Sequence, residues 1–318
     1  MRRGVFLGVL LVTGAASMAA VSFQGQPPPQ LPRPTLQIQK LKDNLYIIPT
    51  GSTPGSREVA FVGGNTAVWV TNTGVVVVDT KVVGWGQAIL DLIKTVTDKP
   101  VTTIINTHTH NDHTGSNTEF PETVNFVAHE NTKANLSKPE CPPVTNCQSF
   151  KGDKAKFLPK TTFKDKMSLL SGKDRIDLYY FGAGHTSGDA WIVFPAVRFV
   201  HAGDMFPWKD APFLDRGNGG SGVALPATLA KAVASLKNVD TVIGGHQPPT
   251  AWQDVADYQR FNQDLLTGAQ AALKAGKTVD EAVASIGPQL EKYKEKGFQS
   301  QRIKGAVQAI YDELNKKP

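Results

Sequence analysis

Three of the seven histidines in this 318-residue chain fall within six consecutive positions. They are His108, His110 and His113 in the segment THTHNDHTG, which also contains Asp112. Imidazole nitrogens and carboxylate oxygens bind zinc in proteins, and a catalytic zinc keeps one position open for water. Residues i and i+2 of an extended segment point the same way, so we expect His108 and His110 to bind one metal ion. A turn after His110 would direct Asp112 and His113 towards a second ion.

Further ligands are expected at three positions flanked by glycine. His185 lies in GAGHTSGD, Asp204 in HAGD and His246 in IGGH. Each adjoins a predicted strand, and glycine lets the backbone pass close to a site. Any one of them alone would be an ordinary polar residue of the core or surface. Together with the histidine-rich segment they favour a metal site.

Hydrophobic patterning predicts one α/β domain in which helices cover the outside of sheets, without a simple βαβ series. Helical periodicity appears at 89–96, at 229–236 and throughout the chain after residue 252. The short β-branched or aromatic runs that predict strands are 45–48, 67–70, 75–78, 101–105, 124–128, 175–181, 190–194, 197–201 and 241–243.

The order H-x-H-x-D-H, then His, Asp and His resembles that of the metallo-β-lactamase superfamily, over the chain from the hairpin near Val75 to His246. The resemblance implies an α/β (α+β) fold, the four-layer αββα sandwich, with the site along one edge. The resemblance implies that His108, His110 and His185 hold a first metal. It implies that Asp112, His113 and His246 hold a second metal, and that Asp204 bridges the two.

Supporting roles follow from the same resemblance. Asp79 is expected to support the site without binding metal, and Asp112 to orient the nucleophile as a catalytic residue. Thr107 and Thr186 are candidate hydrogen-bond donors behind the ligands, although a structural role is equally compatible with a threonine.

The function implied is that of a dinuclear-zinc hydrolase, in which a metal-bound hydroxide cleaves a small ester, lactone, thioester or amide, β-lactams included. True β-lactamases of the superfamily usually carry Cys or a non-ligand where this chain has Asp204, which weakens that assignment. Two alternatives stay open: an iron-dependent oxidoreductase on the same ligands, and a non-catalytic metal-binding protein. Iron and manganese therefore remain alternatives to zinc.

Aromatic residues near the ligands are candidates for the substrate pocket. Phe206, Trp208 and Phe213 follow Asp204 in a segment rich in glycine and proline, and Phe61 lies in a glycine-containing segment on the other side. The remaining histidines, His129 and His201, lie outside the ligand string and are interpreted as structural.

The N-terminus predicts export. Residues 1–20 have the charged, apolar and small-residue order of a signal peptide, 21–35 form a proline-rich linker, and 36–318 form the hydrolase domain with its helical C-terminal segment. A periplasmic or secreted location permits a disulfide between Cys141 and Cys147.

Charge gives little sign of macromolecular partners. The net charge is +6, and no run of Lys or Arg is long enough to indicate a nucleic-acid surface. We therefore expect a small-molecule substrate, no nucleic acid, no membrane contact beyond the signal peptide, and an oligomeric state that the sequence leaves open.

Overall fold

The computed structural model describes residues 31–51 and 59–315. The predicted signal peptide and residues 21–30 of the predicted linker lie outside the described residues. Within the described part, no helix is both long and apolar enough to cross a membrane.

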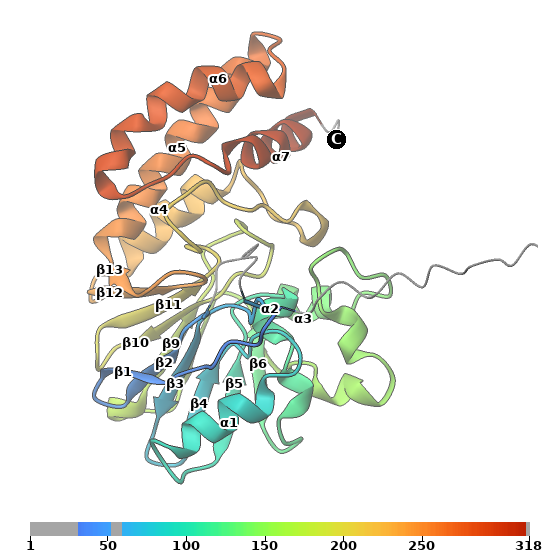
Figure 1. The fold of residues 1–318 in the computed structure, drawn as a ribbon, viewed down its shortest axis with the longest axis vertical. Coiled ribbons are helices and arrows are strands. Elements are labelled where there is room, and N and C mark those ends of the chain that lie inside the picture. The colour runs from blue at the N-terminus through green and yellow to red at the C-terminus, as the bar shows by residue number, and fades with distance from the viewer. Residues whose placement is uncertain (1–30, 52–58, 316–318) are drawn as a thin grey trace, which may run out of the picture.

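Two β-sheets lie face to face, with helices on both outer faces (Figure 1). In spatial order the first sheet consists of β1 (Gln39–Lys42), β2 (Leu45–Ile48), β3 (Thr66–Val70), β4 (Val75–Val78), β5 (Val101–Ile105), β6 (Asn125–His129) and β7 (Thr161–Phe163). The second consists of β13 (Thr250–Ala251), β12 (Thr241–Gly244), β11 (Phe199–Gly203), β10 (Trp191–Phe194), β9 (Ile176–Tyr179) and β8 (Lys166–Leu169).

The period-two direction of strand side chains explains the layers. Val76 and Val78 of β4 belong to the apolar core between the sheets, whereas Val75 and Val77 pack against the outer helices. All four valines are buried, so an unbroken apolar run is what a strand covered on both faces requires. Strand β10 behaves in the same way, with Ile192 facing the first sheet.

The outer layers differ in size. Helices α1 (Gly86–Lys94) and α3 (Glu130–Leu136) cover the first sheet. The second sheet is covered by α4 (Leu225–Ser235), α5 (Gln253–Lys274), α6 (Val279–Leu290) and α7 (Ile303–Asn315), which form the large helical layer at the top of Figure 1. The predicted four-layer αββα sandwich is confirmed.

Most predicted elements are present. Strand ends differ from the predicted ones by at most two residues, whereas α1 and α4 begin three and four residues before the predicted ranges. The predicted hairpin at 72–74 joins β3 and β4, which pair antiparallel. The strands missed by the pattern, β1, β7, β8 and β13, are short edge or near-edge strands. The described sheets also contain parallel pairs, β4 with β5, β5 with β6, β6 with β7, and β11 with β12.

These parallel pairs determine where the candidate site lies. The carboxyl ends of neighbouring parallel strands lie at the same edge of a sheet. Asp79 follows β4 and His108 follows β5, while Asp204 follows β11 and His246 follows β12. The chain positions that carry candidate ligands therefore converge at one edge of the sandwich.

Candidate metal centre

The seven candidate ligands form two adjacent groups of side chains. In the first, one ligand atom from each of His108, His110, His185 and Asp204 lies within 4.8 Å of the others. The second group, of Asp112, His113 and His246, meets the same limit. Each group has the donor types that suit zinc.

A single helical turn directs the ligands of the histidine-rich segment into two different groups. His110 is extended, with φ −68° and ψ 152°, and it precedes the four-residue helix α2 (Asn111–Thr114). The change from extended to helical backbone turns Asp112 and His113 away from the direction of His110. The turn expected after His110 is therefore present as α2.

The disulfide loop supports this turn from outside. Cys141 and Cys147 are bonded, with their Cα atoms 5.6 Å apart, so the predicted disulfide is confirmed. Thr145 within the loop forms an isolated β-bridge with His110. The loop thus packs on the backbone of a candidate ligand.

Asp204 lies between the two groups. Its Oδ2 atom is 3.6 Å from Nε2 of His185 and 3.3 Å from Nε2 of His246. Its Oδ1 atom is 3.4 Å from Nε2 of His113. Gly245 makes this approach possible, since a Cβ there would lie 1.8 Å from Oδ1 of Asp204.

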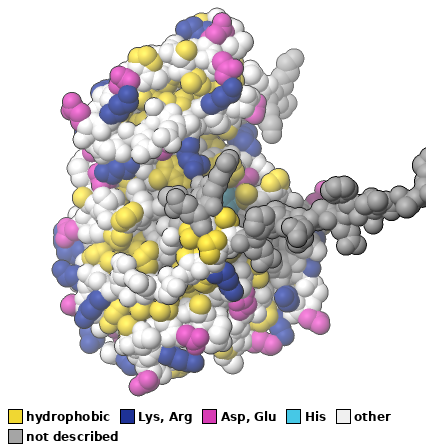
Figure 2. Space-filling model, viewed as in Figure 1, with side chains coloured by type: hydrophobic (Ala, Val, Ile, Leu, Met, Phe, Trp, Pro, Cys, Tyr) yellow, Lys and Arg dark blue, Asp and Glu magenta, His cyan; other side chains and the backbone are white. Residues whose placement is uncertain are grey.

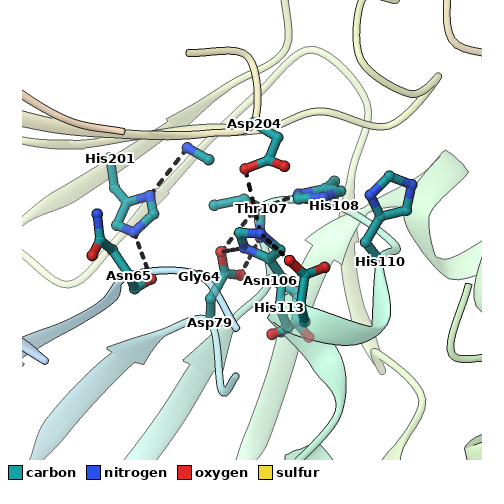
Figure 3. A network of polar contacts seen from close by, with 12 residues as sticks. Gly64, Asn65, Asp79, Asn106, Thr107, His108, His110, His113, His201 and Asp204 are labelled. Atoms are coloured by element: carbon teal, nitrogen blue, oxygen red, sulfur yellow. Dashed lines mark hydrogen bonds and ion pairs between the residues drawn. The ribbon is translucent and has the colours of Figure 1, made fainter. Parts of the chain in front are cut away.

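Asp79 organises the site without belonging to either group. It is fully buried, and its φ of 63° is a left-handed conformation that aspartate tolerates better than most residues. Its carboxylate accepts hydrogen bonds from the Thr107 hydroxyl at 2.7 Å and from Nδ1 of His113 at 2.6 Å (Figure 3). Because Thr107 donates to Asp79, its oxygen accepts from Nδ1 of His108 at 2.9 Å.

This arrangement provides a test of metal binding. With its proton on Nδ1, His108 presents an unprotonated Nε2 to the first group. That atom is buried and has no hydrogen-bond partner among the described residues. A buried polar atom without a partner costs about 1–3 kcal/mol, and a metal ion is the partner that the surrounding donors suit.

Asp215 is a functional candidate that sequence reasoning missed. Its Oδ2 accepts from Nε2 of His110 at 2.8 Å, which turns Nδ1 of His110 towards Nε2 of His185 at 3.0 Å. His185 is itself oriented by Nδ1, which donates to the Phe213 carbonyl at 2.7 Å. The aspartate in FLDRGNGG gave a weak signal, an acidic residue beside glycines, but its partner is 105 positions away.

Electrostatics differ between the groups. Burial, followed by the neighbouring histidines, holds the pKa of His108 well below its usual range, and burial and then His110 lower the pKa of His185 to about 4. For His246, burial is outweighed by Asp204 and Asp112, which raise its pKa to about 9. Burial is likewise outweighed at His113, whose pKa is held well above its usual range by Asp112 and Asp204. The second group therefore lies in a strongly negative potential, which favours a cation.

Three of the four predicted pocket aromatics lie beside the ligands. The ring centroids of Phe61 and Trp208 are 5.8 Å and 5.7 Å from that of His246. Phe213 is 46% exposed and lies 5.9 Å from His185. The prediction for Phe206 is wrong: it is fully buried, 5.1 Å from the ring of Tyr258 in the core beneath the C-terminal helices.

The remaining polar candidates have local structural contacts. His129 accepts from the backbone N–H of Asn131 at the start of α3, and Nε2 of His201 contacts the Asn65 carbonyl at 3.2 Å. Thr186 donates to Asp189, so it braces the His185 loop.

Comparison with known proteins agrees with this geometry. Residues 60–246 match the family model of the metallo-beta-lactamase superfamily. "Metallo-beta-lactamase type 2" of Elizabethkingia meningoseptica is 29% identical over 253 residues, 76% of this chain and 89% of that protein. "Metallo-beta-lactamase IND-1" of Chryseobacterium indologenes is 23% identical over 245 residues, again 76% and 89%.

Solved structures show the same fold. A metallo-beta-lactamase from Pontibacter korlensis superposes with a TM-score of 0.58 at 19% identity, covering 72% of this chain and 99% of that one. The family match ends at the candidate ligand His246, so α5–α7 lie beyond it. The chain belongs to the metallo-β-lactamase superfamily and is a metal-dependent hydrolase.

Proposed function

We propose that this protein is an exported dinuclear-zinc hydrolase acting on a small ester, lactone, thioester or amide. The observation that carries the proposal is the position of Asp204, whose carboxylate lies within 3.6 Å of imidazole nitrogens of both ligand groups. A carboxylate shared between two groups is suited to bridge two cations. The orphaned Nε2 of His108 supports occupation of the first group.

The chain's own residues would hold the ions and prepare the substrate. His108, His110 and His185 would bind one ion. Asp112, His113 and His246 would bind the other, and Asp204 would bind both. Zinc supplies Lewis acidity and lowers the pKa of bound water.

Asp112 would act as the proton acceptor. At its side chain burial alone would raise the pKa, but His113 and His246 outweigh it and lower the pKa of Asp112 to about 2. It is therefore a carboxylate at neutral pH. With 13% of the side chain exposed, against 0% for His113 and 6% for Asp204, it is open towards solvent. A water entering the site can donate a hydrogen bond to it.

Asp79 and Asp215 would fix ring orientation. Asp79 accepts a hydrogen bond from Nδ1 of His113, and Asp215 accepts one from Nε2 of His110. Such partners hold the tautomer and raise ligand basicity. Phe61 and Trp208 would exclude water beside the second group.

Export is part of the proposal. It rests on the charged, apolar and small-residue order of residues 1–20 and on the disulfide, which persists in oxidising compartments. Mass spectrometry of the protein from a periplasmic or culture fraction should show a mature chain that begins near Ala20 or Val21. Intact Met1 would contradict it.

The experiment is metal analysis of the parent and of Asp204→Asn after identical purification without chelator, with hydrolysis of β-lactams, lactones and thioesters measured on the same samples. The change keeps the shape of the side chain and removes one negative charge beside two cations, at a cost of several kcal/mol in metal binding. We expect two zinc ions in the parent, one in the variant, and a steep loss of hydrolysis.

Asp240→Asn is the matched control, because Asp240 pairs with Arg198 at the surface. It should keep two ions and the parent rate. Two ions in Asp204→Asn with an unchanged rate would show that Asp204 does not bridge. Iron in place of zinc, without hydrolysis, would instead support the oxidoreductase alternative.

A further inference from the structure

One short segment, residues 213–222, orients two of the three histidines of the first ligand group. The carboxylate of Asp215 accepts from Nε2 of His110 at 2.8 Å, and the Phe213 carbonyl accepts from Nδ1 of His185 at 2.7 Å. Each contact leaves the other nitrogen of the ring free to bind an ion. The position of this segment therefore decides where the two rings point.

The segment contains a single regular element, the three-residue 3₁₀ turn Arg216–Asn218. Stretches of this kind open locally at a low cost in free energy unless neighbouring elements hold them. The backbone of the segment is bonded to the His185 loop: the Asp215 N–H donates to the His185 carbonyl at 2.9 Å, and the Ser221 N–H donates to the Gly184 carbonyl at 2.8 Å. A shift of the segment would therefore move His185 as well as the Asp215 carboxylate.

Glu313 of α7 holds the segment from outside. Its carboxylate accepts from the Ser221 hydroxyl at 2.5 Å and pairs with the Arg216 guanidinium at 3.2 Å. Arg216 also donates to the Gly220 carbonyl at 2.7 Å, and the Gly220 N–H donates to the Asp215 carbonyl at 2.7 Å. A continuous series of polar contacts thus links Glu313 to Asp215.

Partial burial and apolar packing strengthen this contact. The side chains of Glu313 and Arg216 are only 19% and 27% exposed, so solvent screens their attraction less than that of a surface pair. One turn earlier on α7, the buried Ile310 approaches Gly222 so closely that a Cβ on the glycine would lie 2.5 Å from Cγ1 of Ile310. One face of α7 therefore both bonds to segment 213–222 and packs on it.

Helix α7 lies outside the part of the chain that matches the family model, which ends at residue 246. The layer of C-terminal helices forms one side of the hollow in which a histidine is visible (Figure 2). Partners of ligand histidines hold the tautomer and the ring orientation, and their loss costs about 10–100-fold in metal affinity. In this chain the support for such a partner comes from the C-terminal helical layer.

We propose that Glu313 is a positioning residue of the first ligand group. It holds segment 213–222, and through this segment it sets the ring orientation of His110 and His185. The helix α7 is therefore part of the metal-binding machinery of this chain as well as a cover of the second sheet. This role rests on the proposed function, since zinc is the ion that the first group would hold.

The protonated nitrogen of His110 tests the proposal without metal. Proton–nitrogen correlation spectra of the metal-free protein distinguish the two tautomers of a neutral imidazole. In the parent we expect the proton of His110 on Nε2, the atom that donates to Asp215. In Glu313→Ala the segment loses its outer support, so the spectrum of His110 should average between the tautomers. His201, whose Nδ1 accepts from the Gly203 N–H, is the internal reference and should be unchanged.

Two control variants separate positioning from a general loss of stability. Asp312→Asn removes a charge from the neighbouring residue of α7, whose carboxylate accepts from Gln308 on the exposed face, and it should keep the parent spectrum. Ile286→Ala opens a cavity in the core beneath α6, and it should lower stability while keeping the parent spectrum. Urea unfolding shows whether Ile286→Ala is destabilised at least as much as Glu313→Ala.

A conservative replacement tests the charge. Glu313→Gln keeps an oxygen that can accept from Ser221 and loses the ion pair with Arg216. The His110 spectrum and the zinc affinity of this variant should therefore lie between those of the parent and those of Glu313→Ala.

Zinc affinity is the second measurement. In a His246→Gln background the second group lacks one ligand, whereas the first group keeps its four candidate ligands. Competition with a chromogenic chelator then measures the zinc affinity of the first group. Glu313→Ala should lower this affinity about tenfold, at the lower end of the cost of losing a partner of a ligand histidine. Asp312→Asn and Ile286→Ala should change it less than about twofold.

An unchanged tautomer of His110 in Glu313→Ala would overturn the proposal, as would an unchanged zinc affinity where the parent binds zinc. The same changes in Ile286→Ala would attribute them to stability alone and would also overturn it. If the first group of the parent binds no zinc, the proposed function fails, and the spectra of the metal-free protein still decide whether Glu313 positions His110.

Discussion

Gly64→Ala would add one methyl group beside the second ligand group. A Cβ at this position would lie 2.3 Å from Cε1 and 2.8 Å from Nε2 of His113. Carbon atoms in contact are about 3.5 Å apart, so the ring would have to move by roughly 1 Å. Metal–ligand distances tolerate about 0.2 Å, so the required displacement is several times larger than the site permits.

Neither side of the contact is free to move. His113 is fully buried, and its Nδ1 is held by Asp79. The backbone of Gly64 donates to the Asp112 carbonyl at 2.9 Å and accepts from Nζ of Lys81 at 2.9 Å. We expect the clash to cost about 1–3 kcal/mol of stability through overpacking.

The expected result is therefore loss of the second metal with the first retained, and a hydrolysis rate reduced at least a hundredfold. Metal analysis, urea unfolding and initial rates on one preparation measure these three effects. Gly287→Ala in α6 is the control, because its Cβ would meet nothing within 4 Å. It should keep both metals and gain up to about 1 kcal/mol of helix stability. Two metals and the parent rate in Gly64→Ala would refute the reasoning.

Three further results are expected. Burial lowers the pKa of Lys81 to about 7, which is below its value in the unfolded chain. Because the unfolded chain therefore binds more protons between pH 7 and 10, the stability of the parent relative to Lys81→Met should rise with pH in this range by up to about 1.4 kcal/mol per pH unit. Urea unfolding that shows the same stability difference at every pH would contradict this. Zinc ligation requires neutral imidazoles, so zinc binding to the second group should release protons from His246 and His113, and the zinc affinity should increase as the pH rises towards 9. A zinc titration in weak buffer at pH 7.5 that releases no protons would be evidence against the negative potential at the second group. Replacing Cys141 and Cys147 by serine should lower the free energy of unfolding by about 2–3 kcal/mol and weaken metal retention, since the disulfide loop packs on His110. Equal unfolding midpoints of the parent and the double variant would contradict the supporting role of this loop.

Local sequence patterns determined the layers and the candidate ligands. The four valines of β4 are a β-branched run that predicts a strand, and the structure buries alternate side chains of this strand on opposite faces. His108 and His110 share a group because an extended segment separates them by two residues, and the turn after His110 divides the set. These inferences need only contiguous residues, and the structure brings the seven candidates together at one sheet edge.

Contacts between distant segments were decided by the tertiary structure. Asp215 meets His110 across 105 positions, and Phe206 is buried against Tyr258 although its neighbour Trp208 faces the site. Glu313 reaches segment 213–222 from the far end of the chain. No period or motif encodes such pairs, because strand register and helix packing choose which side chains meet. The sequence therefore indicated the candidate metal ligands, and the fold decided what surrounds them.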